Sequence, residues 1–577
     1  MKTTYNVMML TVLLLLVTTS CNNEELFVDT SLEDPEEIIK DEPDGIELND
    51  KEFTFIPEHW GIVQGVVDSQ TALNNRNILE SIMIKAKSQG FTTFKIDKLD
   101  AYFEVGIVTS ETSNQNFYAS IEAINVPSDF NLIMTDNTHL RVQPNSAPKY
   151  CLLALRDVSN VTVTGGNLYG DRDEHDYSSG GSHEWGDVVE LHAARNSTID
   201  NVKMMNGSGD GLRIHSLKHA FEADYNPSNN LTVKNCTLDS NRRNNISIVD
   251  GFNIYIDSNQ ILNAGIDTPN SKGANPRFGL DVEAVRKSDG NGGYIYYQKA
   301  EDIYITNNTE KGSANGGMTV HIGYNVTIDG NFSERGLSYT YAYGTKIINN
   351  TVTAVQGRAE GAGIGGGKNS ESNSIYDNII AGNTITGFDT GINISNRDVK
   401  VYDNIIKDFE VGIYPINLID SEIYNNTMIS TQDKSKGIFV FRSNMDNVII
   451  RNNDITAEAN SIKLDDCNNS GDAVNYNFLI TGNNFKSPSY TKIDGVQGVE
   501  FLNNSFNQGI QVYDSKNLVF EGNSVITNSH NGIRFRETNY DITLKGNKID
   551  VAEGRDCVVI DSDTNTNEIN QSSNACI

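Results

Sequence analysis

Acidic, basic and histidine side chains recur at fixed places in a series of short apolar phrases. Between residues 188 and 321 these phrases are VVELH, GLRIH, NISIV, GLDVE and GMTVH. Apolar residues alternate with others inside each phrase, which is the pattern of a half-buried β-strand. The alternate residues therefore point outward, and aligning the phrases predicts two outward columns. The first column is Glu190, Arg213, Ser247, Asp281 and Thr319, and the second is His192, His215, Val249, Glu283 and His321.

Asp281 and Glu283 are the first candidates for paired carboxylates that do acid–base chemistry. Residues i and i+2 of a strand face the same side, roughly 6.5–7 Å apart. That separation is at the low end of the roughly 6.5–9.5 Å found in inverting glycosidases, whereas a pair on adjacent coils would be nearer to the retaining distance. Packed like charges should raise one of the two pKa values and so provide a general acid. The alternative is two solvated carboxylates on a strand.

Three of the nine histidines in the chain fall in the second column. We expect His215, together with Glu190 of the first column, to take part in proton transfer. We expect His192, His321 and Arg213 to bind substrate hydroxyl or sulfate groups. Each histidine could instead be an ordinary surface residue. No metal is expected here, because successive coils separate the imidazoles.

The segment GDRDEHDYSSGGSHEWGD, residues 170–187, interrupts the repeat and is rich in polar residues. Polar loops beside a rigid sheet often carry function, and a Trp face is a good platform for a sugar ring. The alternative is a solvated loop, with or without structural calcium. The substrate-binding candidates in it are Asp173, His175, Glu184 and Trp185.

Arginines flank the same phrases, and Arg242 and Arg243 are the candidates for binding an anionic ligand. The guanidinium fork binds carboxylate or sulfate groups bidentately. Pairing with neighbouring Asp or Glu residues is the alternative.

A two-part repeat extends from about residue 150 to the C-terminus. One part is Gly-apolar-x-apolar-x, as in GINIS at Gly391, and the other is Asn-x-apolar-x-apolar-x-x-Asn, as in NLVFEGNSV from Asn517. The unit returns every 21 to 38 residues or so, which predicts a solenoid of stacked strands about 4.8 Å apart. A propeller or a sandwich would not keep one phrase over so many turns. Asn residues at equivalent turns are expected to stack as an amide ladder.

A solenoid needs a cap at its end, and residues 73–89 (LNNRNILESIMIKAKSQ) have the spacing of an amphipathic helix. Ile78, Ile82 and Ala86 would lie on its apolar face, and Gly90 would end it. We therefore expect an all-β protein, a right-handed parallel β-helix with an N-terminal capping α-helix.

The chain has 577 residues and a formal net charge of -31. A single ordinary core of that size is unusual unless it grows along one axis. The negative field disfavours nucleic acid and anionic membrane surfaces as partners. A local basic cluster could still bind an anionic polysaccharide.

The N-terminus resembles a bacterial lipoprotein signal. Val7 to Val17 is too short to span a bilayer and is typical of a signal-peptide core, and small residues precede Cys21, the expected lipidation site. The polar residues after Cys21 resemble the surface-export signals of Bacteroidota lipoproteins. The alternative is a plain secretory peptide. Among the other cysteines, Cys557 and Cys576 could form a terminal disulfide or remain separate buried thiols.

The phrases GDRDEHDY, HEWGD, GSGDGLRIHS, RRNNISIVDG and GLDVEA resemble the pectate-lyase-like right-handed parallel β-helix superfamily, over roughly residues 55–570. That superfamily includes polygalacturonase-like hydrolases, alginate and pectate lyases, carrageenases, fucanases and epimerases. The resemblance implies an enzyme acting on an acidic or sulfated glycan. It does not choose the reaction, because one fold hosts many activities.

The catalytic phrases of the individual families are not reproduced. The Asp-Asp pair and Gly-His-Gly of polygalacturonases are absent, and Gly209-Asp210-Gly211 is only a partial echo of them. The Asp-Pro-His-Asp of mannuronan epimerases is absent too. Iota-carrageenases have Glu-x-Asp, whereas here the order is Asp281-x-Glu283.

These observations lead to a glycoside hydrolase that acts on an acidic or sulfated polysaccharide. A polysaccharide lyase or epimerase, and a non-catalytic surface glycan-binding or adhesion protein, are the alternatives. The expected organisation is a signal peptide (1–20), an acidic tether (21–52) and the β-helix domain (53–577). We expect a monomer at the outer cell surface or secreted, attached to the membrane only through its lipid, with no cofactor unless calcium is bound.

Overall fold

The computed structural model describes residues 51–106, 123–291, 293–355, 361–367, 375–469, 476–564 and 566–577. The chain divides into two units, Met1–Asn49 and Asp50–Ile577. The predicted signal peptide, almost all of the tether and Cys21 therefore lie outside the described residues. Within the described ranges, no helix has both the length and the apolar character needed to cross a membrane.

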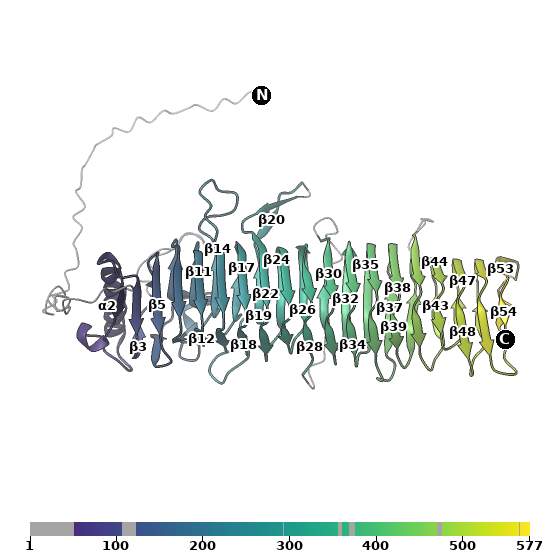
Figure 1. The fold of residues 1–577 in the computed structure, drawn as a ribbon, viewed down its shortest axis with the longest axis horizontal. Helices are drawn as coiled ribbons and strands as arrows, with labels where there is room; N and C mark the ends of the chain where they lie inside the picture. Colours follow the sequence, from purple (N-terminus) through teal and green to yellow (C-terminus); the bar gives the residue numbers. More distant parts are fainter. Residues whose placement is uncertain are drawn as a thin grey trace, which may run out of the picture. The chain divides into compact units, whose positions relative to one another are not determined.

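The described residues form a parallel β-helix in which each coil adds one strand to each of three sheets (Figure 1). The second sheet begins at β1 (Glu52–Thr54) and β2 (Thr93–Ile96) and ends at β53 (Ile569–Ser572), and the third sheet runs from β3 (Leu99–Phe103) to β54 (Ala575–Cys576). The first sheet holds the candidate site residues. Its strands are β4 (Ile124–Asn125), β7 (Lys149–Arg156), β10 (Trp185–His192), β13 (Leu212–His215), β16 (Ile246–Ile248), β19 (Phe278–Glu283), β24 (Gly316–Asp329), β26 (Leu337–Tyr343), β29 (Ala362–Gly366), β32 (Thr390–Arg397), β35 (Val411–Tyr424), β37 (Lys436–Phe441), β40 (Asn460–Asp465), β43 (Thr491–Asp494), β46 (Ile510–Tyr513), β49 (Ile533–Arg536) and β52 (Val558–Ile560).

The predicted alternation and capping helix are both confirmed. In β13, Leu212 and Ile214 are completely buried in the coil interior, which is one continuous apolar core along the stack. Helix α2 (Ser69–Ser88) is N-capped by Asp68, whose carboxylate accepts a hydrogen bond from the Thr71 amide at 2.9 Å. The buried face of α2 includes Leu79 and Met83, and it packs on the same core.

The predicted asparagine ladder runs through most of the stack. At each rung, the side-chain oxygen of one Asn accepts hydrogen bonds from the amide nitrogen and the backbone N–H of the Asn one coil earlier. The residue before a rung often has a positive φ, such as 54° at Asn307 and 65° at Gly482, a conformation that Asn and Gly tolerate best. The rungs are Asn259, Asn308, Asn331, Asn350, Asn383, Asn404, Asn426, Asn453, Asn483, Asn504, Asn523, Asn547 and Asn574.

Replacing a rung should destabilise the β-helix strongly. Asn404 is fully buried, donates to the Ile380 carbonyl at 3.0 Å, and accepts from the Asn383 backbone at 3.0 Å. Asn404→Ala would leave buried donors and acceptors without partners, and we expect a loss of about 2–4 kcal/mol of unfolding free energy. Denaturant unfolding measures it. Asn484→Ala, which removes a surface bond to Asp454, is the control, and equal losses in both variants would contradict the prediction.

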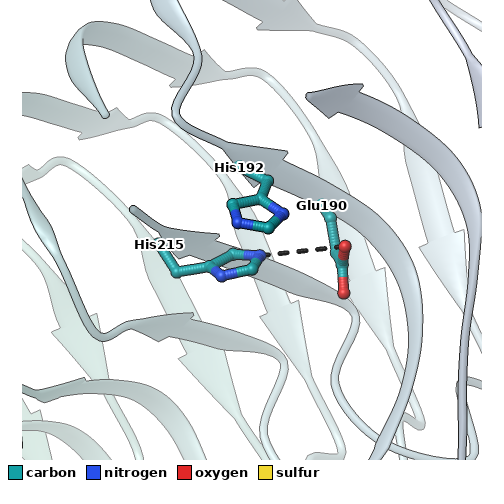
Figure 2. Close-up of side chains that lie close together, drawn as sticks. All are labelled: Glu190, His192 and His215. Atoms are coloured by element: carbon teal, nitrogen blue, oxygen red, sulfur yellow. Dashed lines mark ion pairs between the residues drawn. The ribbon is translucent and has the colours of Figure 1, made fainter. Parts of the chain in front are cut away.

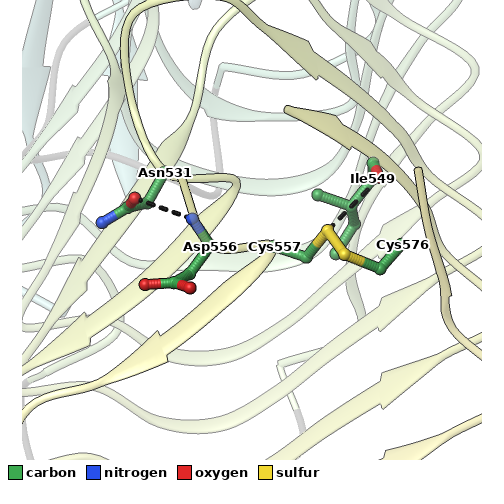
Figure 3. The surroundings of a disulfide bond; sticks show 5 residues. All are labelled: Asn531, Ile549, Asp556, Cys557 and Cys576. Carbon is green, nitrogen blue, oxygen red and sulfur yellow. Dashed lines mark hydrogen bonds between the residues drawn. A yellow bond between two sulfur atoms is a disulfide. The ribbon is translucent and has the colours of Figure 1, made fainter. Parts of the chain in front are cut away.

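The last coil is closed by a disulfide between Cys557 and Cys576, whose Cα atoms are 5.8 Å apart (Figure 3). The sequence had left this pairing open against two separate thiols. Among the described residues, the remaining cysteines, Cys151, Cys236 and Cys467, are free and buried.

Insertions along both edges of the first sheet form two rims. The first rim is residues 170–184, 240–245 and 263–277. The second rim is residues 216–228, 284–291 and 293–299, which contain the β20–β21 hairpin (Arg286–Ser288, Tyr294–Tyr296) visible in Figure 1. The insertions of a rim bind one another. Arg172 Nη1 donates to the Ser240 carbonyl at 2.7 Å in the first rim, and the Ala220 amide donates to the Tyr297 carbonyl at 2.9 Å in the second.

Candidate active site

Glu190 on β10 lies at the centre of a buried ion-pair cluster. Its carboxylate accepts hydrogen bonds from Arg156 Nη2 at 3.0 Å and from Arg213 Nη2 at 2.5 Å. Arg213 Nε also lies 2.8 Å from Asp187 Oδ2, and His215 Nε2 lies 3.7 Å from Glu190 Oε2. Burial raises the pKa of Glu190, but the two guanidinium groups outweigh it and hold that pKa well below its usual range. Glu190 is therefore an ionised carboxylate and not a proton donor.

The expectation that these side chains face solvent is wrong. The register Glu190↔Arg213↔Ser247↔Asp281↔Thr319 is the predicted first column. However, Glu190 is 1% exposed and Arg213 6% exposed, and His192 and His215 are buried as well. Alternation decides only that a side chain leaves the coil interior, so a substrate cannot reach Glu190 or His215 as catalytic groups, or His192 and Arg213 as binding groups, in this structure.

Glu190, His192 and His215 have ligand atoms close enough for a metal ion, all within 4.8 Å of one another (Figure 2). The two imidazole rings stack at 3.8 Å with an angle of 21° between their planes. A divalent cation here would lie beside Arg156 and Arg213, which already hold the Glu190 carboxylate. This donor set therefore does not suit a metal, and we assign none to it.

Stability should fall as the pH is lowered, partly through His215. Burial lowers the pKa of His215 to about 4, below the roughly 6.5 of an unfolded histidine. The unfolded chain therefore binds the extra proton first, and the stabilisation from a neutral His215 is complete above pH ~6.5 and is lost as the pH falls to about 4. We expect His215→Gln to remove about 3 kcal/mol of the difference in unfolding free energy between those two pH values. Parallel pH profiles for wild type and variant would contradict this.

A second row of aligned polar residues links successive coils near the starts of the same strands. This row was not predicted from the sequence. Asp187 Oδ1 accepts from the Asp210 amide at 3.0 Å, Asp210 Oδ1 from the Asn244 amide at 3.0 Å, and Asn244 Oδ1 from the Phe278 amide at 2.9 Å. The signal was available, because Asp187 and Asp210 each stand three residues before an aligned column residue. The Gly209-Asp210-Gly211 phrase thus has a structural explanation in the coil.

Asp281 and Glu283 combine a buried carboxyl group with a carboxyl group that solvent can reach. Within the described part of the predicted patch, no other pair of carboxyl groups does so. Asp281 is 1% exposed, whereas the Glu283 side chain is 36% exposed. Burial and the neighbouring Glu283 charge raise the pKa of Asp281 well above its usual range. Asp281 Oδ1 is buried with no hydrogen-bond partner in the described part of the chain, and a proton shared with Glu283 would satisfy it.

The predicted separation of this pair is wrong. The carboxyl groups of Asp281 and Glu283 are within hydrogen-bonding reach of one another, rather than about 6.5–7 Å apart. Backbone spacing sets only the Cα positions, and the longer Glu side chain can bend back toward the Asp. Arg243 contributes to this arrangement, because its Nη2 lies 3.5 Å from Glu283 Oε2. The distance rule for inverting and retaining glycosidases therefore does not apply to the pair as it stands.

His321 does not join the second column. A register shift between Val282 and Glu283 pairs Glu283 with Ile322, one residue beyond the predicted partner. Val249 lies outside β16, so only His192 and His215 remain aligned. The His321 ring instead meets Tyr341 edge-on at 5.6 Å. A bulge adds one residue to one strand, and single-sequence alignment has no signal for it.

The loop candidate His175 belongs to a buried hydrogen-bond chain rather than to a binding surface. Its Nδ1 lies 2.8 Å from Asp171 Oδ2 and its Nε2 lies 2.9 Å from His183 Nδ1. Tyr150 donates to the other oxygen of Asp171. These contacts fold residues 170–187 onto the coil, so the insertion is structural at its base.

Three other candidates of the same insertion lie nearer to solvent. Trp185 is 38% exposed at the start of β10, and Glu184 is half-buried. Asp173 is exposed and accepts a hydrogen bond from Thr268 Oγ1 at 2.6 Å. Asp173 also borders a cleft of about 210 Å³ beside the third sheet, together with Tyr102 and Tyr169. Among these three residues, Glu184 interacts electrostatically with Arg243, the residue that also faces Glu283.

Arg242 and Arg243 have different surroundings. Arg242 donates to the carbonyls of Lys272 at 3.0 Å and His183 at 2.9 Å, so it ties the first rim together and is not a free anion site as predicted. Arg243 Nη1 lies 2.9 Å from Asp210 Oδ2, and the same guanidinium faces Glu283. Arg243 is therefore the cation of the carboxyl pair.

Comparison with known proteins gives one family match and two curated relatives. Residues 436–577 match the model of the right-handed beta helix region. Over 382 residues, 65% of this chain and 62% of the relative, the chain is 30% identical to the uncharacterized protein YclG of Bacillus subtilis. It is 27% identical over 358 residues to the SPbeta prophage-derived uncharacterized protein YorA of the same organism, and the match covers 61% of this chain and 58% of YorA. The chain thus spans about three fifths of the length of these relatives.

Solved structures resemble the chain at low sequence identity. An exopolygalacturonase from Thermotoga maritima has 15% identity and a TM-score of 0.47, covering 66% of this chain and 92% of its own. The A-module of the mannuronan C-5 epimerase AlgE4 of Azotobacter vinelandii has 13% identity and a TM-score of 0.40, and the match covers 69% of this chain and 94% of that module. The parallel register of all three sheets makes this chain a parallel β-helix protein, and its residues 436–577 match the right-handed beta helix model.

Proposed function

We propose that this protein is a glycoside hydrolase that cleaves an acidic or sulfated polysaccharide, with Glu283 and Asp281 as its acid–base pair. One observation supports this most strongly: a buried carboxyl with a raised pKa touches a second carboxyl that solvent can reach. Such pairs hold one proton between two groups, which is what protonation of a glycosidic oxygen requires.

In this proposal Glu283 contacts the substrate. The buried Asp281 shares one proton with Glu283 and passes it on when Glu283 protonates the substrate. As water adds to the anomeric carbon, the proton of the pair passes to the leaving glycosidic oxygen, the glycosidic bond breaks, and the proton that the water gives up then returns to the pair. Between these two proton transfers, both carboxyl groups are negative. Arg243, 3.5 Å from Glu283, stabilises that state, and its own second partner Asp210 holds it in place. Arg243 would thus lower the cost of proton release at the moment of bond cleavage.

The pair stands on the first sheet, which the two rims border, and the sheet opens on its C-terminal side. There, a groove of about 270 Å³ is lined by Phe278, Gly316, Ser338, Gly365 and Phe388, among others. Ser338 is in register with Thr319 and hydrogen-bonds to it at 2.7 Å, so the groove continues the column of Asp281. A polysaccharide in this groove would reach Glu283 from the uncovered side.

Cations and aromatic rings of the second rim lie near Glu283 in the sequence, and they favour a negatively charged sugar as the substrate. The Arg286 guanidinium stacks on the Tyr294 ring at 3.9 Å and lies 5.2 Å from the Tyr341 ring. Lys287 lies 4.6 Å from the Tyr297 ring. Aromatic faces with cations on them offer contacts to sugar rings and to their carboxylate or sulfate groups.

A polysaccharide lyase or epimerase is the second candidate, because Arg243 could neutralise a uronate carboxylate while Glu283 removes the neighbouring proton. The test is a screen of the purified protein on uronate and sulfated polysaccharides with two readouts. New reducing ends without ultraviolet absorbance support the hydrolase. Reducing ends with the absorbance of an unsaturated uronyl group support a lyase, and altered sugar composition without cleavage supports an epimerase.

Binding without any product would overturn an enzymatic function and favour a surface glycan-binding protein. A matched control is the Glu283→Gln variant on the same panel, because background activity of a contaminant would persist in it. The proposal fails if wild type and Glu283→Gln release the same amount of product.

A further inference from the structure

The outward column of the first sheet continues beyond the groove and becomes uncovered. In register after Ser338 come Gly365 and Asn393. The next residues define what we call the C-terminal lane, and each is half-exposed, whereas Glu190 upstream is 1% exposed. The C-terminal lane consists of Tyr414, Phe439, Lys463, Lys492, Gln511 and Arg534.

The first part of the C-terminal lane is aromatic. The Tyr414 and Phe439 rings lie 5.8 Å apart on adjacent coils, and Phe441, two residues after Phe439, lies 5.7 Å from it. These three rings cover the outer face of two neighbouring strands, β35 and β37. Half-exposed aromatic rings on a rigid sheet provide flat apolar platforms of the kind on which pyranose rings stack.

The second part of the C-terminal lane is cationic. Lys463 and Lys492 occupy consecutive coils, about 4.8 Å apart in the stacking direction, and Arg534 follows two coils later. Lys463 Nζ lies 4.9 Å from the Phe439 ring, which joins the two parts. In a chain with a net charge of -31, an outward row that contains cations and no carboxylate is a local exception.

Carboxylates are present, but they stand in the neighbouring outward position. Asp465 holds Lys463 at 2.7 Å, Asp494 holds Lys492 at 2.6 Å, and Asp561 holds Arg534 at 3.0 Å. The Lys463 side chain is 18% exposed in its pair, so part of it faces solvent. The Lys492 side chain is 31% exposed while paired in this way.

A polar cleft of about 450 Å³ lies at the turns that follow β37 and β40. Its lining includes Arg442, the residue after Phe441, and Asp466, the residue after Asp465. The Arg442 side chain is 71% exposed and lies 3.4 Å from Asp466. The cleft therefore borders the C-terminal lane and has room for a substituent that projects from a bound chain.

We infer that the C-terminal lane binds an extended anionic polysaccharide chain, laid along the coil axis and in line with Asp281 and Glu283. The aromatic part would stack sugar rings and the cationic part would bind their carboxylate or sulfate groups. The coil spacing is comparable to the length of one sugar residue, so successive coils would meet successive residues. The identity of the ligand rests on the proposed function, but binding does not require cleavage.

The test measures binding by the full-length protein carrying Glu283→Gln, which prevents turnover from confusing the result. The probes are a polyuronate, a sulfated galactan and an uncharged glucan, each followed by affinity electrophoresis and calorimetry. In this background, Lys463→Gln with Lys492→Gln should weaken binding to a charged probe by about tenfold or more. Phe439→Ala should weaken it similarly, and added salt should reduce the lysine effect.

The control is Lys346→Gln with Lys400→Gln, the same loss of charge on exposed strand positions of the second sheet. It should bind as the parent does, and all variants should keep the parent unfolding midpoint. The inference is overturned if the lane variants bind as tightly as the control, or if the uncharged glucan binds as well as the charged probes. If binding depends on the lane residues but the wild type shows no turnover, the inference about the C-terminal lane holds and only the hydrolase proposal is wrong.

Discussion

Replacing Glu283 by Gln should lower turnover of the polysaccharide substrate by about 100-fold or more, and Asp281→Asn should do the same. Either change removes the shared proton, since the amide can neither release a proton at neutral pH nor accept one from its partner. Burial and the Glu283 charge raise the pKa of Asp281, so the pair keeps its proton to a higher pH than an ordinary aspartate would. Reducing-end release per enzyme molecule measures the effect, and the loss should be in kcat rather than in KM.

The matched control for this prediction is Glu500→Gln, an exposed glutamate on β44 (Gln497–Leu502) of the second sheet. It should retain wild-type turnover. In wild type, the rate should fall as the pH rises through the raised pKa of Asp281, because the acid form is lost. Full activity of either pair variant would show that the catalytic groups lie elsewhere.

Replacing Arg213 by Met should cost about 3–5 kcal/mol of unfolding free energy, as expected when one partner of a buried ion-pair cluster is removed. Arg213 is 8% exposed at its side chain and contacts Glu190 at 2.5 Å and Asp187 at 2.8 Å. Methionine keeps much of the volume but leaves two buried carboxylates without this cation. Without Arg213, only Arg156 offsets the desolvation cost of the ionised Glu190, and Asp187, whose pKa burial raises, loses its contact with Arg213 Nε.

Denaturant unfolding compares Arg213→Met with Lys545→Met. Lys545 lies 2.8 Å from Glu521, but the two side chains are 56% and 45% exposed. Solvent screens such a pair, so its loss should cost less than about 1 kcal/mol. A similar, small effect of both substitutions would mean that the Glu190 cluster contributes little to the fold.

Local patterns were sufficient for the architecture. Alternation in phrases such as GLRIH placed Leu212 and Ile214 inside, and the repeat placed Glu190, Arg213 and Asp281 in one register. Such predictions succeed because the coil is built from neighbouring segments, so that each strand meets its counterpart one repeat away. The capping helix was predictable for the same reason.

Those patterns could not predict which outward side chains of the first sheet are buried and which are exposed. The insertions between strands decide it, since residues 170–187 fold back through Asp171 and His175 and the second rim closes through Ala220 and Tyr297. These contacts join segments that share no repeat. His192 and His215 are buried, although the alternation had placed them correctly outside the coil interior.

The carboxyl pair shows where the two sources of information meet. The sequence by itself determined that Asp281 and Glu283 share one side of one strand, because a strand alternates with period two. Only the tertiary structure decided that one is buried, that the other is accessible, and that Arg243 joins them. It also moved His321 out of line through the register shift after Val282. Side-chain conformation, burial and bulges depend on contacts between distant segments, and no local repeat encodes those contacts.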